Sequence, residues 1–230
     1  MCGRFVGFRK LEELQVYFPI DQTVCDVAAN YNVAPSQPVL AIVKRDGQNV
    51  LDRFHWGLVP FWAKDTTIGH KLINARSETI AEKPSFRNAF RKKRCLILAD
   101  GFYEWAGKKG DKQPVFITLP DDKPFAFAGL WETWQQKDSQ ERYQSCTIIT
   151  TAACDAIRPI HHRMPVILNP DCYETWIDPV QQDTVALGNV LKSKAQTEFK
   201  IESVSKRVNI VRHNGPANIA PVQTEFDFNT

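Results

Sequence analysis

The first five residues, Met1-Cys2-Gly3-Arg4-Phe5, are the part of this chain whose residue types suggest chemistry most directly. Because Cys2 is small, methionine aminopeptidase is expected to remove Met1 and leave cysteine at the N-terminus. That cysteine then carries an α-amine with a reference pKa of about 7.7–8.0 and, next to it, a thiol that is partly ionised near pH 7. Two chemistries follow: acyl transfer with the amine as base, or capture of an aldehyde as a five-membered thiazolidine. Taken alone, position 2 could equally be a cysteine without a catalytic role.

The composition is that of an ordinary globular protein. The 230 residues suffice for one substantial core, and one domain is the default. Hydrophobic residues make up 43% and charged residues 24% of the chain, and the net charge of +3 permits a nucleic-acid partner without demanding one. No apolar run approaches the roughly 18 residues of a membrane span, and no signal-peptide pattern is present. We therefore expect a cytoplasmic protein without membrane association.

The other cysteines are scattered along the chain, at Cys25, Cys95, Cys146, Cys154 and Cys172. They form no Cys-x-x-Cys pair, which argues against both a zinc knuckle and a redox-active dithiol. In a reducing cytosol these thiols should be free. We predict no metal and no cofactor.

Hydrophobic patterning predicts more strands than helices. Strands are expected over 39–45 and 50–58, joined by the hairpin signal Arg45-Asp46-Gly47-Gln48. Further strands are expected over 95–99, 114–119, 125–130, 146–151, 164–168 and 201–211, and helices over 9–18, 84–93, 171–177 and 180–192. Strict alternation of strand and helix is missing, so we predict an α+β fold. It should be a single domain with a mainly antiparallel, barrel-like β-sheet core and flanking short helices.

Four short segments are too polar for their apolar surroundings, and each carries a candidate functional side chain: Asn32, Asn74, Glu104 or His161. The first is expected to be a loop entering a strand, and the third places Glu104 just beyond the end of an apolar strand. Taken singly, the two asparagines could be turn formers, Glu104 a solvated charge and His161 a core histidine. The segments are 31–35 (YNVAP), 73–79 (INARSET), 99–105 (ADGFYEW) and 160–166 (IHHRMPV).

Together and in this order, these segments resemble one family. MCGRF, YNVAP, the Trp-Gly-x-x-Pro of 56–60, INAR, ADGFYEW and IHHRMPVIL are similar to motifs of the SOS-response-associated peptidase (SRAP) family of abasic-site DNA crosslinking proteins. The resemblance runs from Met1 to about Leu168, with weaker agreement at 204–209 and 220–222. It implies an SRAP domain over residues 1–222 and a C-terminal tail over 223–230.

The resemblance implies that the N-terminal amine condenses with the ring-opened aldehyde of an abasic site in single-stranded DNA, and that the Cys2 thiol then closes a thiazolidine. Closure removes the imine that would otherwise allow β-elimination and strand cleavage. Glu104 matches the family's acid/base, a role that a raised pKa would suit. His161 matches the histidine that hydrogen-bonds the released sugar oxygen, and Asn74 the asparagine that orients the N-terminal cysteine. His162 is expected to be structural.

The same resemblance assigns the contacts with DNA. Arginine guanidinium groups suit phosphates that flank the reacting sugar, and tryptophans suit stacking on bases or a wedge against duplex. Trp56 could instead belong to the core, and the basic run over 87–94 is expected to be mainly a solvated helix face. At 61–63 the chain reads Phe-Trp-Ala, so a second adjacent tryptophan found in some relatives is absent, which weakens the expected stacking. The expected DNA contacts are Arg4, Asn32, Pro35, Trp56, Trp62, Arg76 and Arg163.

Two functions of other classes stay open. Glutamine amidotransferases with an N-terminal nucleophile also begin Met-Cys-Gly, but that reading does not predict INAR, ADGFYEW and IHHRMPV in this order. A passive module that binds single-stranded DNA without a covalent step is the other alternative. The family name further implies a peptidase that cleaves its own N-terminal extension, although only Met1 precedes Cys2 here.

The C-terminal tail suggests a protein partner. Gln223, Phe226 and Phe228 fit the spacing of a peptide that binds the bacterial replication sliding clamp, and a few buried aromatic anchors can carry most of such a binding energy. The two phenylalanines could instead pack the terminus onto the domain. We expect a monomer that is associated with the nucleoid when bound to DNA.

Overall fold

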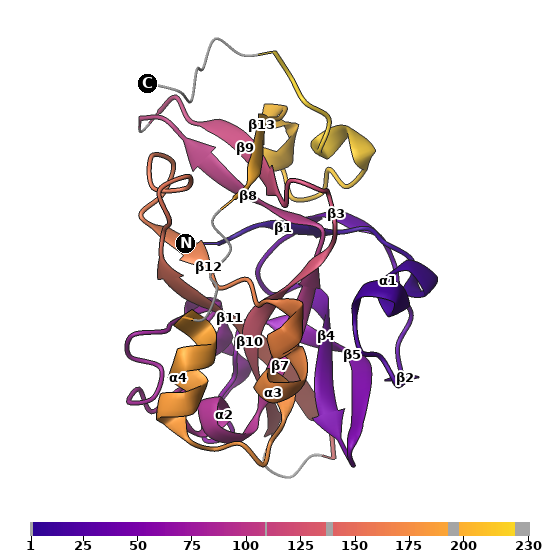
Figure 1. The fold of residues 1–230 in the computed structure, drawn as a ribbon, viewed down its shortest axis with the longest axis vertical. Coiled ribbons are helices and arrows are strands. Elements are labelled where there is room, and N and C mark those ends of the chain that lie inside the picture. Colours follow the sequence, from indigo (N-terminus) through magenta and orange to yellow (C-terminus); the bar gives the residue numbers. More distant parts are fainter. Residues whose placement is uncertain (1, 109, 137–139, 193–197, 224–230) are drawn as a thin grey trace.

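The computed structural model describes residues 2–108, 110–136, 140–192 and 198–223. Its strands form two sheets, and short helices surround the larger one (Figure 1). The strands are β1 (Phe5–Gly7), β2 (Gln22–Thr23), β3 (Asn30–Val33), β4 (Pro38–Arg45), β5 (Gln48–Trp56), β6 (Asn74–Arg76), β7 (Arg94–Ala99), β8 (Gly101–Ala106), β9 (Gln113–Thr118), β10 (Phe125–Gln135), β11 (Arg142–Ala152), β12 (Arg163–Pro165) and β13 (Lys200–Ser203). The α-helices are α1 (Leu11–Tyr17), α2 (Arg87–Lys92), α3 (Tyr173–Ile177) and α4 (Thr184–Lys192), and the 3-10 helices are η1 (Thr66–Lys71), η2 (Pro170–Cys172), η3 (Lys206–Asn209) and η4 (Pro216–Asn218).

The larger sheet closes on itself as a five-stranded barrel. β5, β4, β7, β10 and β11 pair antiparallel in that order. A short parallel contact, in which Ser145 and Cys146 of β11 face His55 and Trp56 of β5, completes the ring. β12 and β6 extend the sheet along β11, and β2 extends it along β5. The α+β fold and its barrel-like core are confirmed.

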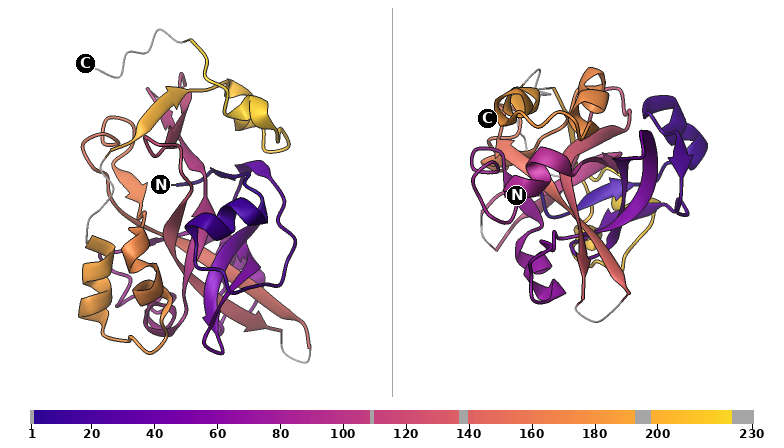
Figure 2. Two further views of the ribbon diagram at one scale, coloured as in Figure 1. Left: turned by 45° about the vertical axis from the view of Figure 1, so that its right-hand side comes forward. Right: turned by 90° about the horizontal axis from the view of Figure 1, so that it is seen from below.

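The smaller sheet is antiparallel, with the order β13-β9-β8-β1-β3, and it covers one end of the barrel (Figure 1, Figure 2). The N-terminal strand β1 lies inside this sheet between β8 and β3, where Phe5 faces Phe102 and Val33. The chain start is therefore held by strands on both sides, and this pairing places Cys2 beside β8.

A sharp corner at Asp100 carries the chain from the barrel strand β7 into β8 of the smaller sheet. The Asp100 carboxylate accepts hydrogen bonds from the backbone N–H of Phe8 at 2.7 Å and from Nε of Arg9 at 2.8 Å. The next residue is glycine, and a Cβ there would come within 2.5 Å of the Phe116 ring and 2.9 Å of the Ile117 backbone carbonyl oxygen. This corner sets the position of the following residues of β8, Glu104 among them.

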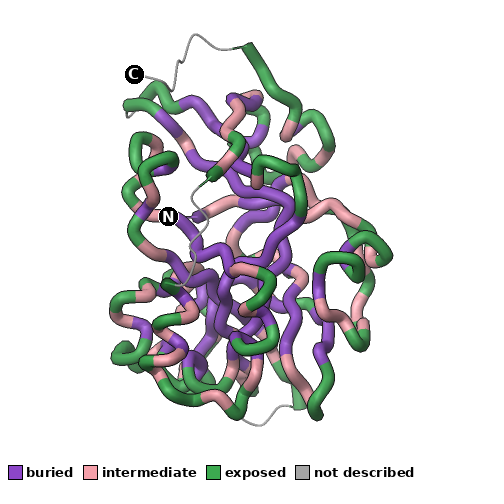
Figure 3. Tube along the Cα trace, viewed as in Figure 1, coloured by how far each residue is buried: buried purple, intermediate pink, exposed green. Residues whose placement is uncertain are grey.

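Alternating side chains of the barrel strands build two apolar cores, as the period of a β-strand requires. The inward set includes Val43, Ile97 and Phe127, and it continues beneath the smaller sheet to Phe5 and Phe102. The outward set, including Ile42, Leu96 and Ala128, packs under Leu14, Phe90, Trp176 and Leu187 of the four α-helices. Buried residues accordingly follow the centre of the molecule, with exposed segments around them (Figure 3).

Most of the expected elements are present, and the differences are few. The 39–58 hairpin is confirmed, with Asp46 and Gly47 both at positive φ as a tight hairpin turn requires. The expected last strand over 201–211 is wrong beyond Ser203, where the chain enters η3. Short strands at 5–7 and 30–33 were not expected, because their pairing partners are distant in sequence. The strand at 101–106 was not expected either, although it pairs with the nearby strand β9.

The basic run over 87–94 is not entirely a solvated helix face. Arg94 is buried, and its guanidinium donates hydrogen bonds to five backbone carbonyl groups, those of Trp176, Phe90, Arg91, Asp178 and Gln181. Burial lowers its pKa to about 10. This arginine ties the end of α2 to α3 and the loop that follows it.

Candidate active site

Cys2 lies at the end of the barrel core, with no exposed surface. Its backbone carbonyl accepts a 2.8 Å hydrogen bond from Nδ2 of Asn74. Asn74 is placed there by the parallel pairing of β6 with β11, where it faces Ile148. Burial raises the pKa of the Cys2 thiol, and the negative charge of Glu104 acts in the same direction. The thiol therefore holds its proton until a neighbouring base removes it.

Glu104 lies within strand β8, opposite Val115 of β9. The expectation that it follows the end of a strand is therefore wrong, because the chain turns at Asp100 and resumes as a strand of the second sheet. Its side chain is almost completely enclosed, at 5% exposure. Burial raises the pKa of this carboxyl to about 7, while the positive charge of the N-terminus acts in the opposite direction. A carboxyl with this pKa can give and take protons near neutral pH.

His161 lies in the turn that enters β12, two residues before Arg163. The backbone N–H of Arg163 donates to Nδ1 of His161 at 2.9 Å. The proton of the neutral ring therefore sits on Nε2. The carbonyl oxygen of Arg163 lies 3.0 Å from the same Nδ1 and accepts a hydrogen bond from it only when that nitrogen carries a proton. Burial lowers the pKa of His161, helped by the positive N-terminus, so the neutral ring is favoured.

His162 is exposed and stacks on the His161 ring, with centroids 4.4 Å apart. The stacked His162 ring covers one face of the His161 ring, and its structural role stays a prediction. Asn74 holds the backbone of Cys2, the charge of Glu104 acts on the Cys2 thiol, and strand β12, which follows His161, lies beside the start of the chain (Figure 1, Figure 2). The expected catalytic residues Cys2, Asn74, Glu104 and His161 thus converge from four separate segments.

Two of the expected DNA contacts, Asn32 and Trp56, are structural. Asn32 is 1% exposed, and its amide Nδ2 donates to the carbonyl groups of Val208, Ile210 and His213. Its role is to hold the C-terminal segment 208–213 against β3. Trp56 is fully buried and contacts the Phe5 ring in an edge-to-face arrangement. Its Nε1 donates a hydrogen bond to the Ile73 carbonyl at 2.8 Å. Neither side chain offers an exposed surface in this structure, so burial argues against the expected DNA contact for both.

Arg4 and Pro35 lie beside Asn32. Nη1 of Arg4 donates to Oδ1 of Asn32 at 2.6 Å and to the Val208 carbonyl at 2.8 Å, and the guanidinium lies 5.9 Å from the Trp105 ring centroid. Arg4 is half-buried, and desolvation lowers its pKa. Pro35 is half-buried in the turn after β3. The guanidinium of Arg4 is therefore partly used by contacts within the protein, and only the rest of it is available to a ligand.

Trp62 is half-exposed at 49%, next to Phe61 at 55%. It borders a surface hollow of about 420 Å³ that also includes Lys64, Ile68 and Lys71. The Trp134 indole N–H fixes this loop by donating to the Ala63 carbonyl at 2.8 Å. An accessible ring beside two lysines has the character that stacking on a base next to phosphate requires.

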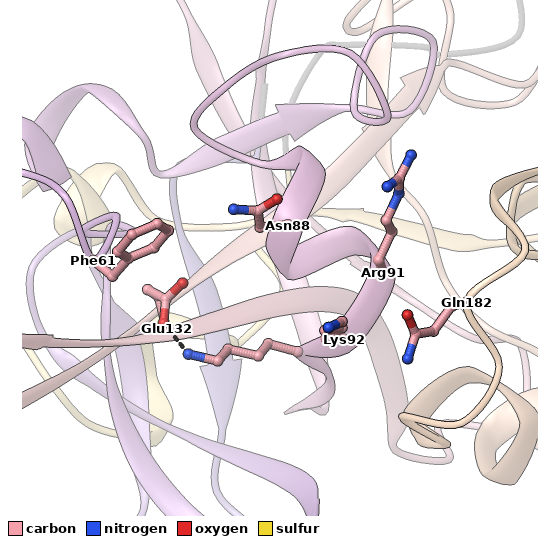
Figure 4. Close-up of a pocket in the computed structure, with 7 residues that line it drawn as sticks. Phe61, Asn88, Arg91, Lys92, Glu132 and Gln182 are labelled. Atoms are coloured by element: carbon pink, nitrogen blue, oxygen red, sulfur yellow. Dashed lines mark hydrogen bonds and ion pairs between the residues drawn. The ribbon is translucent and has the colours of Figure 1, made fainter.

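Phe61 faces a different hollow of about 410 Å³ (Figure 4). An ion pair between Lys93 and Glu132 lies on one side of it, with Asn88 and Arg91 on helix α2 and Gln182 on a neighbouring loop. None of the expected site residues lines this hollow. Phe61 and Trp62, although adjacent in sequence, thus border two separate depressions.

The two remaining arginines, Arg76 and Arg163, differ in their exposure and in their contacts with other side chains. Arg76, at the end of β6, is exposed. Arg163, at the start of β12, is held by a bidentate ion pair with Glu78, with Nη1–Oε1 at 2.6 Å and Nη2–Oε2 at 2.9 Å. Sequence reasoning missed Glu78, although it belongs to the INARSET segment. Its partner lies 85 residues away, so only the adjacency of β6, β11 and β12 reveals the pair.

In the described part of the chain, no group of three or more His, Cys, Asp or Glu side chains is arranged to hold a metal ion. None of the described helices is both long and apolar enough to span a membrane. The expected clamp-binding residues Phe226 and Phe228 lie outside the described residues, whereas Gln223 is exposed.

Comparison with known proteins gives consistent matches over nearly the whole chain. The family model described as SOS response associated peptidase (SRAP) matches residues 1–211. The chain is 42% identical over 221 residues to the abasic site processing protein YoqW of Bacillus subtilis, covering 94% of this chain and 97% of that protein. It is 30% identical to the abasic site processing protein YedK of Escherichia coli, covering 96% and 100%. A solved structure from Bacteroides thetaiotaomicron superposes with a TM-score of 0.84 at 26% identity, covering 96% of this chain and 100% of that one.

Proposed function

The chain belongs to the SOS response associated peptidase (SRAP) family, and on that premise we propose that it processes abasic sites in single-stranded DNA by forming a covalent crosslink through Cys2. The observation that carries this proposal is the convergence of Cys2, Asn74, Glu104 and His161 at the start of the chain. Its relatives named abasic site processing proteins cover nearly the same length. The product is a thiazolidine that shields the abasic site from strand cleavage.

Formation of this product balances as the loss of one water. Removal of Met1 frees the Cys2 amine, which attacks C1′ of the ring-opened sugar, so that a C–N bond forms and the aldehyde oxygen becomes a hydroxyl group. That hydroxyl leaves as water with one added proton, and an iminium ion results. The Cys2 sulfur then attacks C1′, a C–S bond forms, the π electrons of the C=N bond pass to nitrogen, and the thiol proton goes to a base. Without the iminium, the C2′ proton is no longer acidic enough for β-elimination.

Glu104 is the group that moves these protons. With a pKa of about 7 it is present in both protonation states near neutral pH, so it can protonate the leaving hydroxyl and then accept the thiol proton. The second transfer is needed because burial holds the Cys2 thiol in its protonated form. An ordinary exposed glutamate would be ionised throughout and a poor acid at this pH.

His161 and Asn74 position the reactants. The neutral His161 ring has its proton on Nε2, so it can donate a hydrogen bond to the O4′ oxygen released when the sugar ring opens. The Asn74 amide holds the Cys2 carbonyl and thereby fixes the backbone that carries both nucleophiles. Exposed Arg76 contacts a flanking phosphate, and Trp62 stacks on a base.

Two other activities remain testable alternatives. A glutaminase would use the same amine as base and the thiol as nucleophile, but the family match over residues 1–211 favours the DNA reaction. A peptidase that trims the N-terminus is suggested by the family description alone, and we propose it only as an autoprocessing step. A passive DNA-binding protein would leave no shifted band on denaturing electrophoresis after mixing with abasic DNA.

Intact mass spectrometry tests the proposal directly. The protein is incubated with single-stranded DNA that contains one uracil and has been treated with uracil-DNA glycosylase. We expect a species with the summed mass of the DNA and the protein lacking Met1, minus one water. Cys2→Ala should abolish the heat-stable adduct, while Cys25→Ala, a half-buried thiol near strand β2, should form it normally. A heat-stable adduct of undiminished yield from Cys2→Ala would refute the thiazolidine.

A further inference from the structure

Glu78 and Arg163 form a bidentate ion pair next to the candidate active site. Both carboxylate oxygens of Glu78 accept from the two terminal nitrogens of the guanidinium, at 2.6 and 2.9 Å. Nη2 of Arg163 also donates to the Thr150 carbonyl at 2.7 Å. The Arg163 side chain is only 11% exposed, and its hydrogen bond lowers the pKa of Glu78. Bidentate pairs of this kind are strong and geometrically specific.

This pair leaves little of Arg163 for a phosphate. One edge of the guanidinium faces Glu78, Nη2 is shared with Thr150, and Nε is buried. A DNA phosphate would first have to displace a carboxylate that already occupies the same bidentate position. The side chain thus serves as an anchor in this arrangement, and a contact with a phosphate requires the pair to open.

The backbone of Arg163 is what reaches the site. Its N–H donates to Nδ1 of His161, and its carbonyl lies 3.0 Å from the same atom. Only His162 separates the two residues, and the His162 carbonyl is itself bonded to the N–H of Ala153 beyond the end of β11. A displacement of the Arg163 backbone therefore changes which group faces Nδ1, and with it the position of the ring proton.

We propose that Glu78 is a positioning residue for the crosslinking reaction: by locking the side chain of Arg163, it holds the Arg163 N–H on His161 Nδ1 and so keeps the His161 proton on Nε2. This inference rests on the proposed function for its consequence in DNA chemistry. The link from Glu78 to the state of the His161 ring stands on the hydrogen bonds alone.

Glu78→Gln tests the proposal, with Glu82→Gln as the matched control. The control makes the same charge change at an exposed acid four residues along the chain. The nitrogen chemical shifts of the His161 ring, assigned by their loss in His161→Gln, report which nitrogen carries the proton. We expect the Nε2–H form in the wild type and in Glu82→Gln, and a mixture of the two tautomers in Glu78→Gln.

The reaction with abasic DNA gives the second readout. At saturating DNA, adduct formation by Glu78→Gln should slow about tenfold or more, since a displacement of about 1 Å can cost about 10²-fold. Its affinity for intact single-stranded DNA should stay unchanged. If the variant folds poorly by thermal denaturation, Arg163→Lys provides the second test, because it keeps the charge but cannot form the bidentate pair.

Two results would overturn the proposal. One is an unchanged His161 tautomer in both Glu78→Gln and Arg163→Lys. The other is a Glu78→Gln variant that binds intact DNA more tightly, with a steeper salt dependence and an unaltered adduct rate, because Glu78 would then merely compete with phosphate for Arg163. If the wild type forms no adduct at all, the proposed function fails, while the tautomer measurement still decides the role of Glu78.

Discussion

Replacing Glu104 with glutamine should make the protein more stable, and increasingly so as the pH rises. The carboxyl is almost completely enclosed, and burial raises its pKa from 4.5 to about 7. At pH values between these two pKa values, Glu104 keeps its proton in the folded chain but has lost it in the unfolded chain. The contribution of this carboxyl to stability is therefore fully present below about pH 4.5 and is lost as the pH rises through about 7. Glutamine has no such proton to lose.

The size of the effect follows from the two pKa values. The difference between about 7 and 4.5 corresponds to about 3.4 kcal/mol, at about 1.36 kcal/mol for each pH unit, when the pH reaches about 8. At about pH 5.5 only about 1.4 kcal/mol of this has been lost, because the folded carboxyl is still protonated. The advantage of Glu104→Gln should thus grow by about 2 kcal/mol between these conditions. For a chain of this length that is a change of about 4–8 °C in the Tm difference.

Differential scanning calorimetry of the wild type and Glu104→Gln at both pH values measures this change. Taking the difference between the two proteins cancels the other titrating groups, and the exposed Glu82→Gln serves as a control that should show no such trend. A Tm difference that is the same at both pH values would refute the reasoning, since Glu104 would then be ionised already at pH 5.5. The stabilised variant should also form the DNA adduct about 10²–10⁴-fold more slowly, the usual loss for a missing acid/base.

Two further predictions concern the surface. Arg76→Ala should weaken binding to intact single-stranded DNA and lower the slope of log K against log salt by about 0.7, the value for one lost phosphate contact; an unchanged slope in a filter-binding titration would exclude that contact. Truncation after Val222 should abolish retention by the bacterial sliding clamp in a pull-down, if Gln223, Phe226 and Phe228 bind it; equal retention of the full and truncated chains, or of neither, would exclude the tail as a clamp ligand.

Local sequence signals determined those elements whose pairing partners are near in the chain. The Asp46-Gly47 turn between two β-branched runs predicted the β4–β5 hairpin, because this dipeptide suits the positive φ angles of the turn. The strands β1, β3 and β8 were not predicted. β1 and β3 are short and pair with residues far away in the sequence, such as Phe5 with Phe102 and Val33, so no local pattern distinguishes them from loops. β8 also pairs with the nearby β9, but its polar Glu104 made the segment look like a loop after the preceding strand.

Residue type alone could not separate functional side chains from structural ones. Trp56 and Trp62 lie six residues apart in one aromatic, Pro-rich stretch, yet one is fully buried and the other half-exposed. Asn32 looked like a ligand-binding amide, but its amide nitrogen is used by three carbonyl groups of the C-terminal segment 208–213. Burial and hydrogen bonding are set by the packing of distant segments, which no single motif contains.

The sequence by itself determined the chemistry that this protein can offer: a cysteine that becomes N-terminal once Met1 is removed, and the glutamate, histidine and asparagine of its polar segments. Those groups have their reactive character as residue types, independent of the fold. Only the tertiary structure decided the protonation states and the contacts of these groups. Enclosure at the junction of the barrel and the second sheet raises the pKa of Glu104 to about 7 and keeps the Cys2 thiol protonated. The contact of β6, β11 and β12 places Glu78 on Arg163, because a charge responds to its surroundings in space and not to its neighbours in sequence.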